Sequence, residues 1–163
     1  SLETENKIQS ICSSFVDAKG SMFLGRGYSF PIALEGALKL KELAYVHAEG
    51  YPAGEMKHGP LALIEDGMPV VVIAPRDQHY KKTISNMQEV IARGAKVLLV
   101  TNKSKDEVYS ENIWETIEVE NTEDELFPFL VTIPLQKLAY YSALKKGYDI
   151  DKPRNLAKSV TVE

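Results

Sequence analysis

The sequence predicts an α/β fold, a flavodoxin-like three-layer sandwich with a central, mostly parallel sheet, in a single domain of 163 residues. Two apolar runs, PVVVIA at 69–74 and KVLLVT at 96–101, are continuous rather than alternating, which is typical of strands buried on both faces. Segments of helical periodicity separate the strand-like runs, and this alternation favours a parallel sheet covered by helices on both faces. The chain is long enough for one well-cored domain and short for two.

The beginning of the chain predicts a helix, a short strand and a glycine turn. Residues 4–18 have apolar positions at helical spacing, and Cys12 lies among them, which indicates a packed thiol rather than a nucleophile. Residues 21–24 predict a short apolar strand. The sequence GRGYS at 25–29 follows, and it is compatible with a tight turn or with a backbone cradle for an anion.

The central stretch, residues 30–60, predicts a helix followed by a glycine-rich loop. Five residues form one strip on a helical wheel, each within roughly 40° of Glu35: Glu35, Lys39, Glu42, Val46 and Glu49. Most of the remaining circumference is apolar, so we expect a helix that is nearly surrounded by protein and that carries a narrow charged strip. The loop after Gly50 contains three ionisable residues: Glu55, Lys57 and His58.

The second half of the chain completes the alternating pattern. Residues 78–93 predict a helix, and residues 114–120 alternate as an edge strand does. Residues 125–146 predict a long helix in which Pro134 marks a kink or a late start. Ligands of such sheets bind outside the carboxyl ends of the strands, which gives one candidate rim: residues 25–29, 75–78 and 101–104.

Composition excludes several functional classes. A net charge of −4 without a Lys/Arg-rich tract argues against nucleic acid as a partner. No apolar run approaches the ~20 residues that span a bilayer, and a single cysteine favours a reducing, cytoplasmic location over a disulfide framework. No metal-ligand cluster or nucleotide-binding motif is apparent, so we expect no metal and no cofactor. Because the chain begins at Ser1 rather than Met, we expect a fragment of a longer protein.

The last segment, residues 148–163, does not have a helical pattern. A polar chain end of this kind is usually frayed. Three apolar residues could instead dock it on the domain: Leu156, Val160 and Val162. Composition alone leaves both alternatives open.

Two segments carry a resemblance to a known family. ALEGALKLKELAYVHAEGYPAGEMKHGPLALI at 33–64 and DKPRNLAKSVTVE at 151–163 resemble glutamine–fructose-6-phosphate aminotransferase (isomerizing), the glucosamine-6-phosphate synthase family. The resemblance is to the C-terminal lobe of the sugar isomerase (SIS) region and extends over nearly the whole chain. It implies one SIS lobe over residues 1–163, with 148–163 as a tail that contributes to the active site.

The resemblance also implies roles for residues of the central stretch. His58 would open the sugar ring, a step that needs a group able to move a proton near neutral pH. Glu42 would move a proton between C1 and C2, with Lys39 beside it to stabilise the oxyanion, and Glu35 would contact sugar hydroxyls. Without the resemblance, Glu35, Lys39 and Glu42 are typical of an exposed ion-pair ladder worth ~0.3–0.5 kcal/mol per pair.

In the tail, the resemblance implies that Lys158 forms a Schiff base with the substrate carbonyl. Arg154 and Asn155 would bind substrate or hold the tail over the site. The family's phosphate-binding cluster and its glutaminase nucleophile belong to a preceding SIS lobe and an N-terminal glutaminase domain, and neither matches this sequence. We therefore expect the fragment alone to be inactive.

The implied substrate and product are fructose 6-phosphate and glucosamine 6-phosphate, and the implied assembly is a homodimer in which His58 acts across the interface. Two other readings remain open. One is a non-catalytic regulatory SIS domain that binds a sugar phosphate. The terminal lysine and the helix carboxylate argue against this alternative, because a sensor needs neither. The other is a flavin-binding flavodoxin-like protein, which absorption of visible light would reveal.

Overall fold

The computed structural model describes residues 2–104 and 112–154. Its five strands form one sheet in the order β2-β1-β3-β4-β5, and all neighbours are parallel. This strand order is that of flavodoxin-like folds, so the predicted fold class is confirmed. The elements are α1 (Leu2–Asp17), β1 (Ser21–Gly25), α2 (Ser29–Ala44), β2 (Ala48–Pro52), the 3₁₀ helices η1 (Ala53–His58) and η2 (Pro60–Leu63), β3 (Pro69–Ile73), α3 (Tyr80–Ile91), β4 (Lys96–Asn102), β5 (Glu115–Val119) and α4 (Phe127–Lys145).

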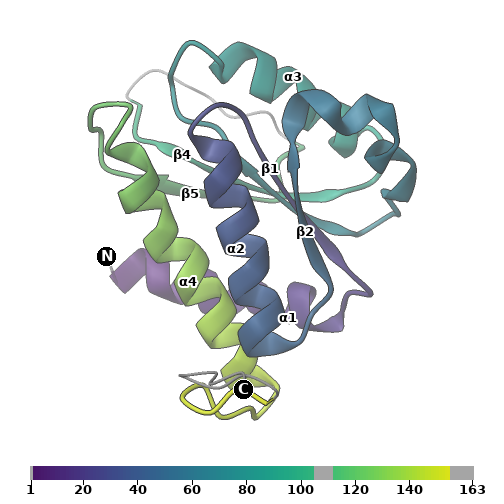
Figure 1. Cartoon of the computed structure of the whole chain (residues 1–163), viewed down its shortest axis with the longest axis vertical. Helices are drawn as coiled ribbons and strands as arrows, with labels where there is room; N and C mark the ends of the chain where they lie inside the picture. Colours follow the sequence, from purple (N-terminus) through teal and green to yellow (C-terminus); the bar gives the residue numbers. More distant parts are fainter. Residues whose placement is uncertain (1, 105–111, 155–163) are drawn as a thin grey trace, which may run out of the picture.

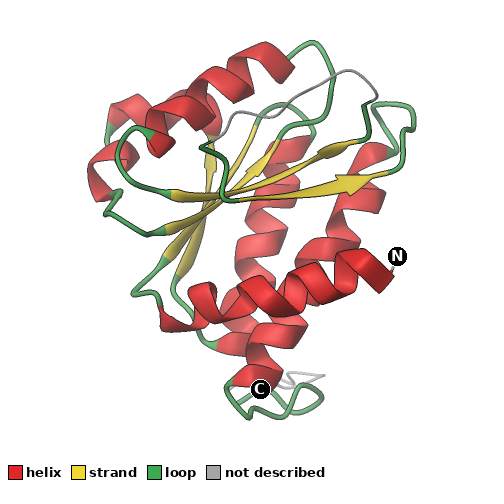
Figure 2. Ribbon diagram, turned by 180° about the vertical axis from the view of Figure 1, so that it is seen from behind, coloured by secondary structure: helices red, strands yellow, loops and turns green. Residues whose placement is uncertain are grey.

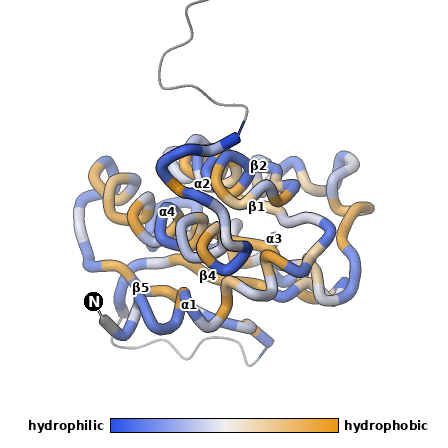
Figure 3. The backbone as a smooth tube through the Cα atoms, turned by 90° about the horizontal axis from the view of Figure 1, so that it is seen from below, coloured by the Kyte–Doolittle hydropathy of each residue, from blue (hydrophilic) through white to orange (hydrophobic). Residues whose placement is uncertain are grey.

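Two apolar cores lie on opposite faces of the sheet because successive side chains of a strand point to opposite sides. Phe23 belongs to the core covered by α1, α2 and α4, whereas its neighbours Met22 and Leu24 belong to the core under α3 and η1. Figure 1 shows α2 and α4 side by side in the layer that covers the core of Phe23. Figure 2 shows the strands between the two helical layers. Along α1, hydrophobic and hydrophilic residues alternate from turn to turn, as expected for a helix with one buried face (Figure 3).

The packing of α2 depends on a glycine. A Cβ on Gly36 would lie 2.9 Å from Cδ1 of Leu135 in α4 and 3.0 Å from ring carbons of Phe23 in β1. Gly36 therefore allows α2 to approach the sheet and α4 more closely than any other residue would. This contact holds the helix that carries the predicted charged strip.

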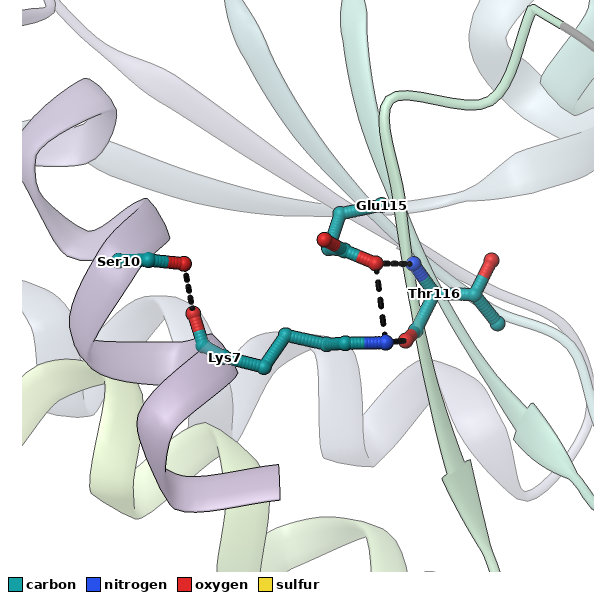
Figure 4. A network of polar contacts seen from close by, with 4 residues as sticks. All are labelled: Lys7, Ser10, Glu115 and Thr116. Atoms are coloured by element: carbon teal, nitrogen blue, oxygen red, sulfur yellow. Dashed lines mark hydrogen bonds and ion pairs between the residues drawn. The ribbon is translucent and has the colours of Figure 1, made fainter. Parts of the chain in front are cut away.

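A lysine of helix α1 caps the outer edge of β5. Lys7 of α1 donates a hydrogen bond from Nζ to the backbone carbonyl of Thr116 at 2.9 Å and pairs with the Glu115 carboxylate at 3.1 Å (Figure 4). An unpaired strand edge is a template for association with other chains, and a lysine on the edge reduces that hazard. The predicted edge position of this strand is confirmed.

The predicted end of the central helix is wrong. Helix α2 stops at Ala44, and Glu49 lies in strand β2, which pairs with β1 in parallel register. Val46 lies in the connection between α2 and β2, and long-range pairing with β1 determines the conformation of Glu49. The late start proposed at Pro134 is also wrong, because α4 begins at Phe127 and continues through that proline.

Candidate functional site

Three of the predicted site residues form one polar ladder on α2. Nζ of Lys39 donates a hydrogen bond to Oε2 of Glu42 at 2.7 Å and lies 3.5 Å from Oε1 of Glu35. The spacings i,i+3 and i,i+4 place all three side chains on one helix face. We refer to Glu35, Lys39 and Glu42 as the α2 ladder.

The α2 ladder is set in an apolar surface. Its side chains are 28–39% exposed. On the helical wheel it lies between the exposed residues Leu34 and Leu38 and the face of α2 that packs on α4. Helix α4 adds further exposed apolar side chains: Phe129, Ile133, Tyr140 and Leu144. The expectation that protein surrounds α2 is therefore wrong for this chain alone, since part of the apolar surface of the helix is open.

The electrostatics of the ladder define the state of Lys39. The hydrogen bond to Glu42, together with the charge of Glu35, raises the pKa of Lys39 above its ordinary value. Lys39 is therefore a cation at neutral pH, and its amine is not free to attack a carbonyl. It can neutralise an oxyanion that develops beside Glu42, while Glu42 can accept or donate a proton.

His58 lies in the other helical layer. It ends η1, which follows β2 at the carboxyl edge of the sheet, and the apolar residues of η1 belong to the core under α3. Glu42 is near the end of α2, on the opposite face. The structure therefore does not bring His58 and the α2 ladder together within one chain.

Within η1, His58 is held by a carboxylate that sequence reasoning did not single out for this role. Oε2 of Glu55 lies 2.6 Å from Nδ1 of His58, so the imidazole has one nitrogen engaged and Nε2 available. Both side chains are largely exposed. The i,i+3 spacing of Glu55 and His58 in the sequence was the signal that could have identified the pair.

Of the three tail residues predicted for the site, Arg154 is the one that lies within the described residues. Its guanidinium stacks on the ring of Tyr45, at the end of α2, with 4.1 Å between the guanidinium carbon and the ring centroid. Asn155 and Lys158 lie outside the described residues. Tyr45 did not emerge from the sequence, because the residues that contact it are more than 100 positions away.

The carboxyl rim of the sheet is occupied by contacts among its own residues. The Arg26 guanidinium donates to Oδ1 of Asn86 at 2.9 Å, and the backbone N–H of Arg76 donates to Oδ1 of Asn102 at 2.9 Å. A Cβ on Gly25 would lie 2.3 Å from the Ser29 carbonyl oxygen, so a glycine is required for the turn itself. These contacts account for the glycine as a feature of a tight turn.

Two hollows of about 380 and 500 Å³ open elsewhere on the surface, at the amino edge of the sheet and beside β5. Neither is lined by His58 or by the α2 ladder. Within the described part of the chain, no group of three or more His, Cys, Asp or Glu side chains could hold a metal ion. None of the helices described is long and apolar enough to cross a membrane.

The sequence of this chain matches a known protein family. Residues 14–146 match the SIS domain. The chain belongs to the SIS domain family. Most of α1 and the residues after 146 lie outside the matched range.

Among curated relatives, the chain is 53% identical over 162 residues to the glutamine–fructose-6-phosphate aminotransferase [isomerizing] of Bartonella henselae, which covers 99% of this chain and 27% of the relative. It is 52% identical to the enzyme of the same name from Aquifex aeolicus, with the same coverage. The SIS domain thus spans about a quarter of the length of these relatives.

Solved structures of related proteins have the same fold as this chain. The C-terminal domain of glucosamine-fructose-6-phosphate aminotransferase from Francisella tularensis superposes with a TM-score of 0.86 at 47% identity, over 93% of this chain and 42% of that chain. Glucosamine-6-phosphate deaminase from Thermotoga maritima superposes with a TM-score of 0.73 at 28% identity, over 97% and 46% of the two chains. In both, more than half of the solved chain lies outside the part that corresponds to this SIS domain.

Proposed function

We propose that this SIS domain is the C-terminal isomerase lobe of a glutamine–fructose-6-phosphate aminotransferase (isomerizing). The parent enzyme would combine fructose 6-phosphate with ammonia from glutamine, release water and form glucosamine 6-phosphate. The observation that carries the proposal is the α2 ladder, in which a carboxylate and a lysine cation are paired at 2.7 Å on a helix face. The relatives that are 52–53% identical over the whole domain support the choice of reaction.

The α2 ladder supplies what the isomerisation step requires. After ammonia replaces the C2 carbonyl oxygen as an imine, a proton must leave C1 and a proton must reach C2. Glu42 would carry that proton, a role for which a positioned carboxylate contributes typically about 10²–10⁴-fold in rate. Lys39, a cation because of its ladder contacts, would stabilise the oxygen at C1 as charge develops there, and Glu35 would bind sugar hydroxyls.

His58 would open the ring of fructose 6-phosphate through Nε2, with Glu55 engaging Nδ1. Since His58 and Glu42 lie in opposite layers of the domain, the simplest complete site uses His58 from a second copy of the chain. A homodimer, with the histidine of one subunit beside the ladder of the other, is the assembly that fits this arrangement.

The tail would provide the remaining nucleophile. The family resemblance implies that Lys158 forms a Schiff base with the C2 carbonyl, with loss of water, and ammonia would then displace the lysine amine to leave the C2 imine. Lys39, which is held as a cation, is not available for that attack. Arg154 stacks at the end of α2 and would guide the tail towards the ladder, and Asn155 would bind substrate beside it.

A preceding SIS lobe of the parent chain would cover the apolar surface around the α2 ladder. Leu34 and Leu38 are exposed on α2 beside the ladder, and α4 adds further exposed aromatic and aliphatic side chains, a composition typical of a surface that packs against protein. Such a lobe would supply phosphate contacts, and a glutaminase domain would supply ammonia. We place the parent enzyme in the cytoplasm.

The test uses the full-length parent protein with Glu42→Gln, which keeps the shape of the side chain and removes its proton-transfer capacity. We expect glucosamine 6-phosphate formation to fall by about 10²–10⁴-fold, while glutamine hydrolysis remains measurable. Glu65→Gln is the control, because Glu65 is exposed and, within the described residues, its carboxylate pairs with Lys19, far from the ladder in sequence. A Glu42→Gln variant with near wild-type turnover would remove the proposed role, and a wild-type parent that binds sugar phosphate without turnover would favour the regulatory alternative.

A further inference from the structure

Tyr45 ends α2 in an unusual backbone conformation. Its φ of 53° and ψ of 36° are left-handed, and within the described residues it is the one non-glycine residue with positive φ. Glycine or asparagine normally takes this position at a helix end, because a Cβ crowds the neighbouring carbonyl there. A tyrosine is therefore present where glycine would be unstrained, which suggests that its side chain has a use.

The contacts of Tyr45 indicate what that use is. Its hydroxyl accepts a hydrogen bond from the backbone N–H of Arg154 at 2.7 Å. The guanidinium of Arg154 stacks 4.1 Å above the Tyr45 ring centroid, and the ring of Tyr148 lies 4.8 Å from it, centroid to centroid. We refer to Tyr45, Tyr148 and Arg154 as the tail clasp.

The segment between α4 and Arg154 is built to reach this position. Gly147 ends α4 with φ 70°, and the N–H of Tyr148 closes onto the carbonyl of Ala143 at 3.1 Å. The Tyr148 ring then packs against the core that α1, α2 and α4 cover. Oδ1 of Asp149 accepts two backbone N–H groups further along, at 2.9 and 3.2 Å, which turns the chain back towards α2 (yellow in Figure 1).

We propose that Tyr45 is a positioning residue, and that the tail clasp fixes the point from which the chain beyond Arg154 starts. Tyr45 is three residues from Glu42, so a chain fixed at Tyr45 starts within about one helical turn of the ladder carboxylate. The inference rests on the proposed function, in which this tail brings Lys158 to the substrate. Tyr45 acts only through the tail and touches no reacting atom.

The test uses two variants of the full-length parent protein. Tyr45→Gly removes the ring and the hydroxyl but suits the left-handed conformation, so the helix end is not strained and folding is retained. Tyr45→Phe keeps the ring and removes only the acceptor for the Arg154 N–H. Trypsin reports the clasp directly, since it can cut after Arg154 but is blocked after Lys152 by Pro153.

In Tyr45→Gly we expect cleavage after Arg154 to be about five- to tenfold faster than in wild type, because a stacking contact and a hydrogen bond are lost together. Tyr45→Phe should give a smaller acceleration. If the clasp positions the tail, kcat for sugar conversion falls in the same order, with the KM for fructose 6-phosphate and glutamine hydrolysis little changed.

Two results would overturn the inference. One is cleavage after Arg154 at the wild-type rate in Tyr45→Gly, which would show that no clasp restrains the chain there. The other is faster cleavage with unchanged sugar turnover, which would show that the clasp has no part in the reaction. A wild-type parent protein that forms no glucosamine 6-phosphate would instead overturn the proposed function, and the positioning role with it, whatever the cleavage rates.

Discussion

Lys39 is the residue whose chemical state decides how the α2 ladder can work. Because its pKa is raised, chiefly by the hydrogen bond from Nζ to Glu42, it keeps its proton through the whole range below its ordinary pKa of 10.5. The stabilisation from the paired cation is fully present below that pH and is lost only as pH rises through the raised value. Loss of activity below neutral pH therefore cannot come from Lys39.

At the residue scale we predict that Lys39→Met in the parent protein lowers glucosamine 6-phosphate formation by about 10²–10³-fold, as when one donor to a developing oxyanion is removed. The measurement is steady-state sugar turnover at neutral pH. Lys41→Met is the matched control, because Lys41 is an exposed lysine on the same helix outside the ladder. Equal effects of the two substitutions would mean that the ladder has no special role.

At the scale of a single element, the position of α2 depends on Gly36. Replacing a helical glycine with alanine usually stabilises a helix by roughly 0.5–1 kcal/mol. Here the added Cβ would meet Leu135 and Phe23 at 2.9–3.0 Å, so we predict that Gly36→Ala lowers the free energy of unfolding by about 1–3 kcal/mol. Urea denaturation measures this. A stabilised variant would contradict the tight contact between α2, α4 and β1, and Lys41→Ala on the exposed face provides the control.

The contact between α1 and α4 predicts that the stability of the domain depends on pH. The Glu5 carboxylate accepts hydrogen bonds from the Tyr141 hydroxyl and, at 2.9 Å, from Lys137 Nζ, and these contacts lower the pKa of Glu5 below its ordinary value of 4.5. The associated stability is present above that pH and is lost as pH falls through the lowered pKa.

We therefore expect the difference in unfolding free energy between wild type and Glu5→Gln to shrink as pH is lowered from about 6 to about 3. Urea denaturation at each pH measures the difference. Glu3→Gln is a control on the same helix, since Glu3 is exposed. A difference that stays constant with pH would mean that the Glu5 contacts add no stability.

The sequence predicted some elements and not others for identifiable reasons. The continuous runs at β3 and β4 are local signals of buried strands, and they were sufficient for the fold class. Strand β2 has the sequence AEGYP, in which glutamate, glycine and proline are all unfavourable in strands, so only its pairing with β1 makes it one. Because β2 was not expected, the crossing of the chain to the layer that carries His58 was not expected either.

The same distinction applies to the site. The α2 ladder was predictable because its contacts follow from i,i+3 and i,i+4 spacing on one helix. The contact between Tyr45 and Arg154 joins residues 109 positions apart, and no spacing rule indicates it. The sequence predicted a nearly surrounded helix although Leu34 and Leu38 are exposed, because apolar residues at a domain surface and in a core have the same pattern.

At the scale of the whole molecule, the domain presents parts of a site on separate faces. The ladder and the tail clasp lie in the layer of α2 and α4, and the Glu55–His58 pair lies in the layer of α3 and η1. Within one copy, the sheet lies between these two layers. We therefore propose that each complete site combines the ladder of one subunit with His58 of another.

Hybrid dimers of the full-length parent protein test this proposal most directly. Each carries Glu42→Gln in one subunit and His58→Asn in the other, and two affinity tags allow the hybrid to be isolated. If His58 acts across the interface, one of the two sites is intact. The hybrid then has about half the wild-type sugar turnover, although the Glu42→Gln and His58→Asn homodimers are both inactive. The matched hybrid, with both substitutions in one subunit and a wild-type partner, should be inactive. The reverse pattern, an inactive first hybrid and a half-active second, would contradict the account.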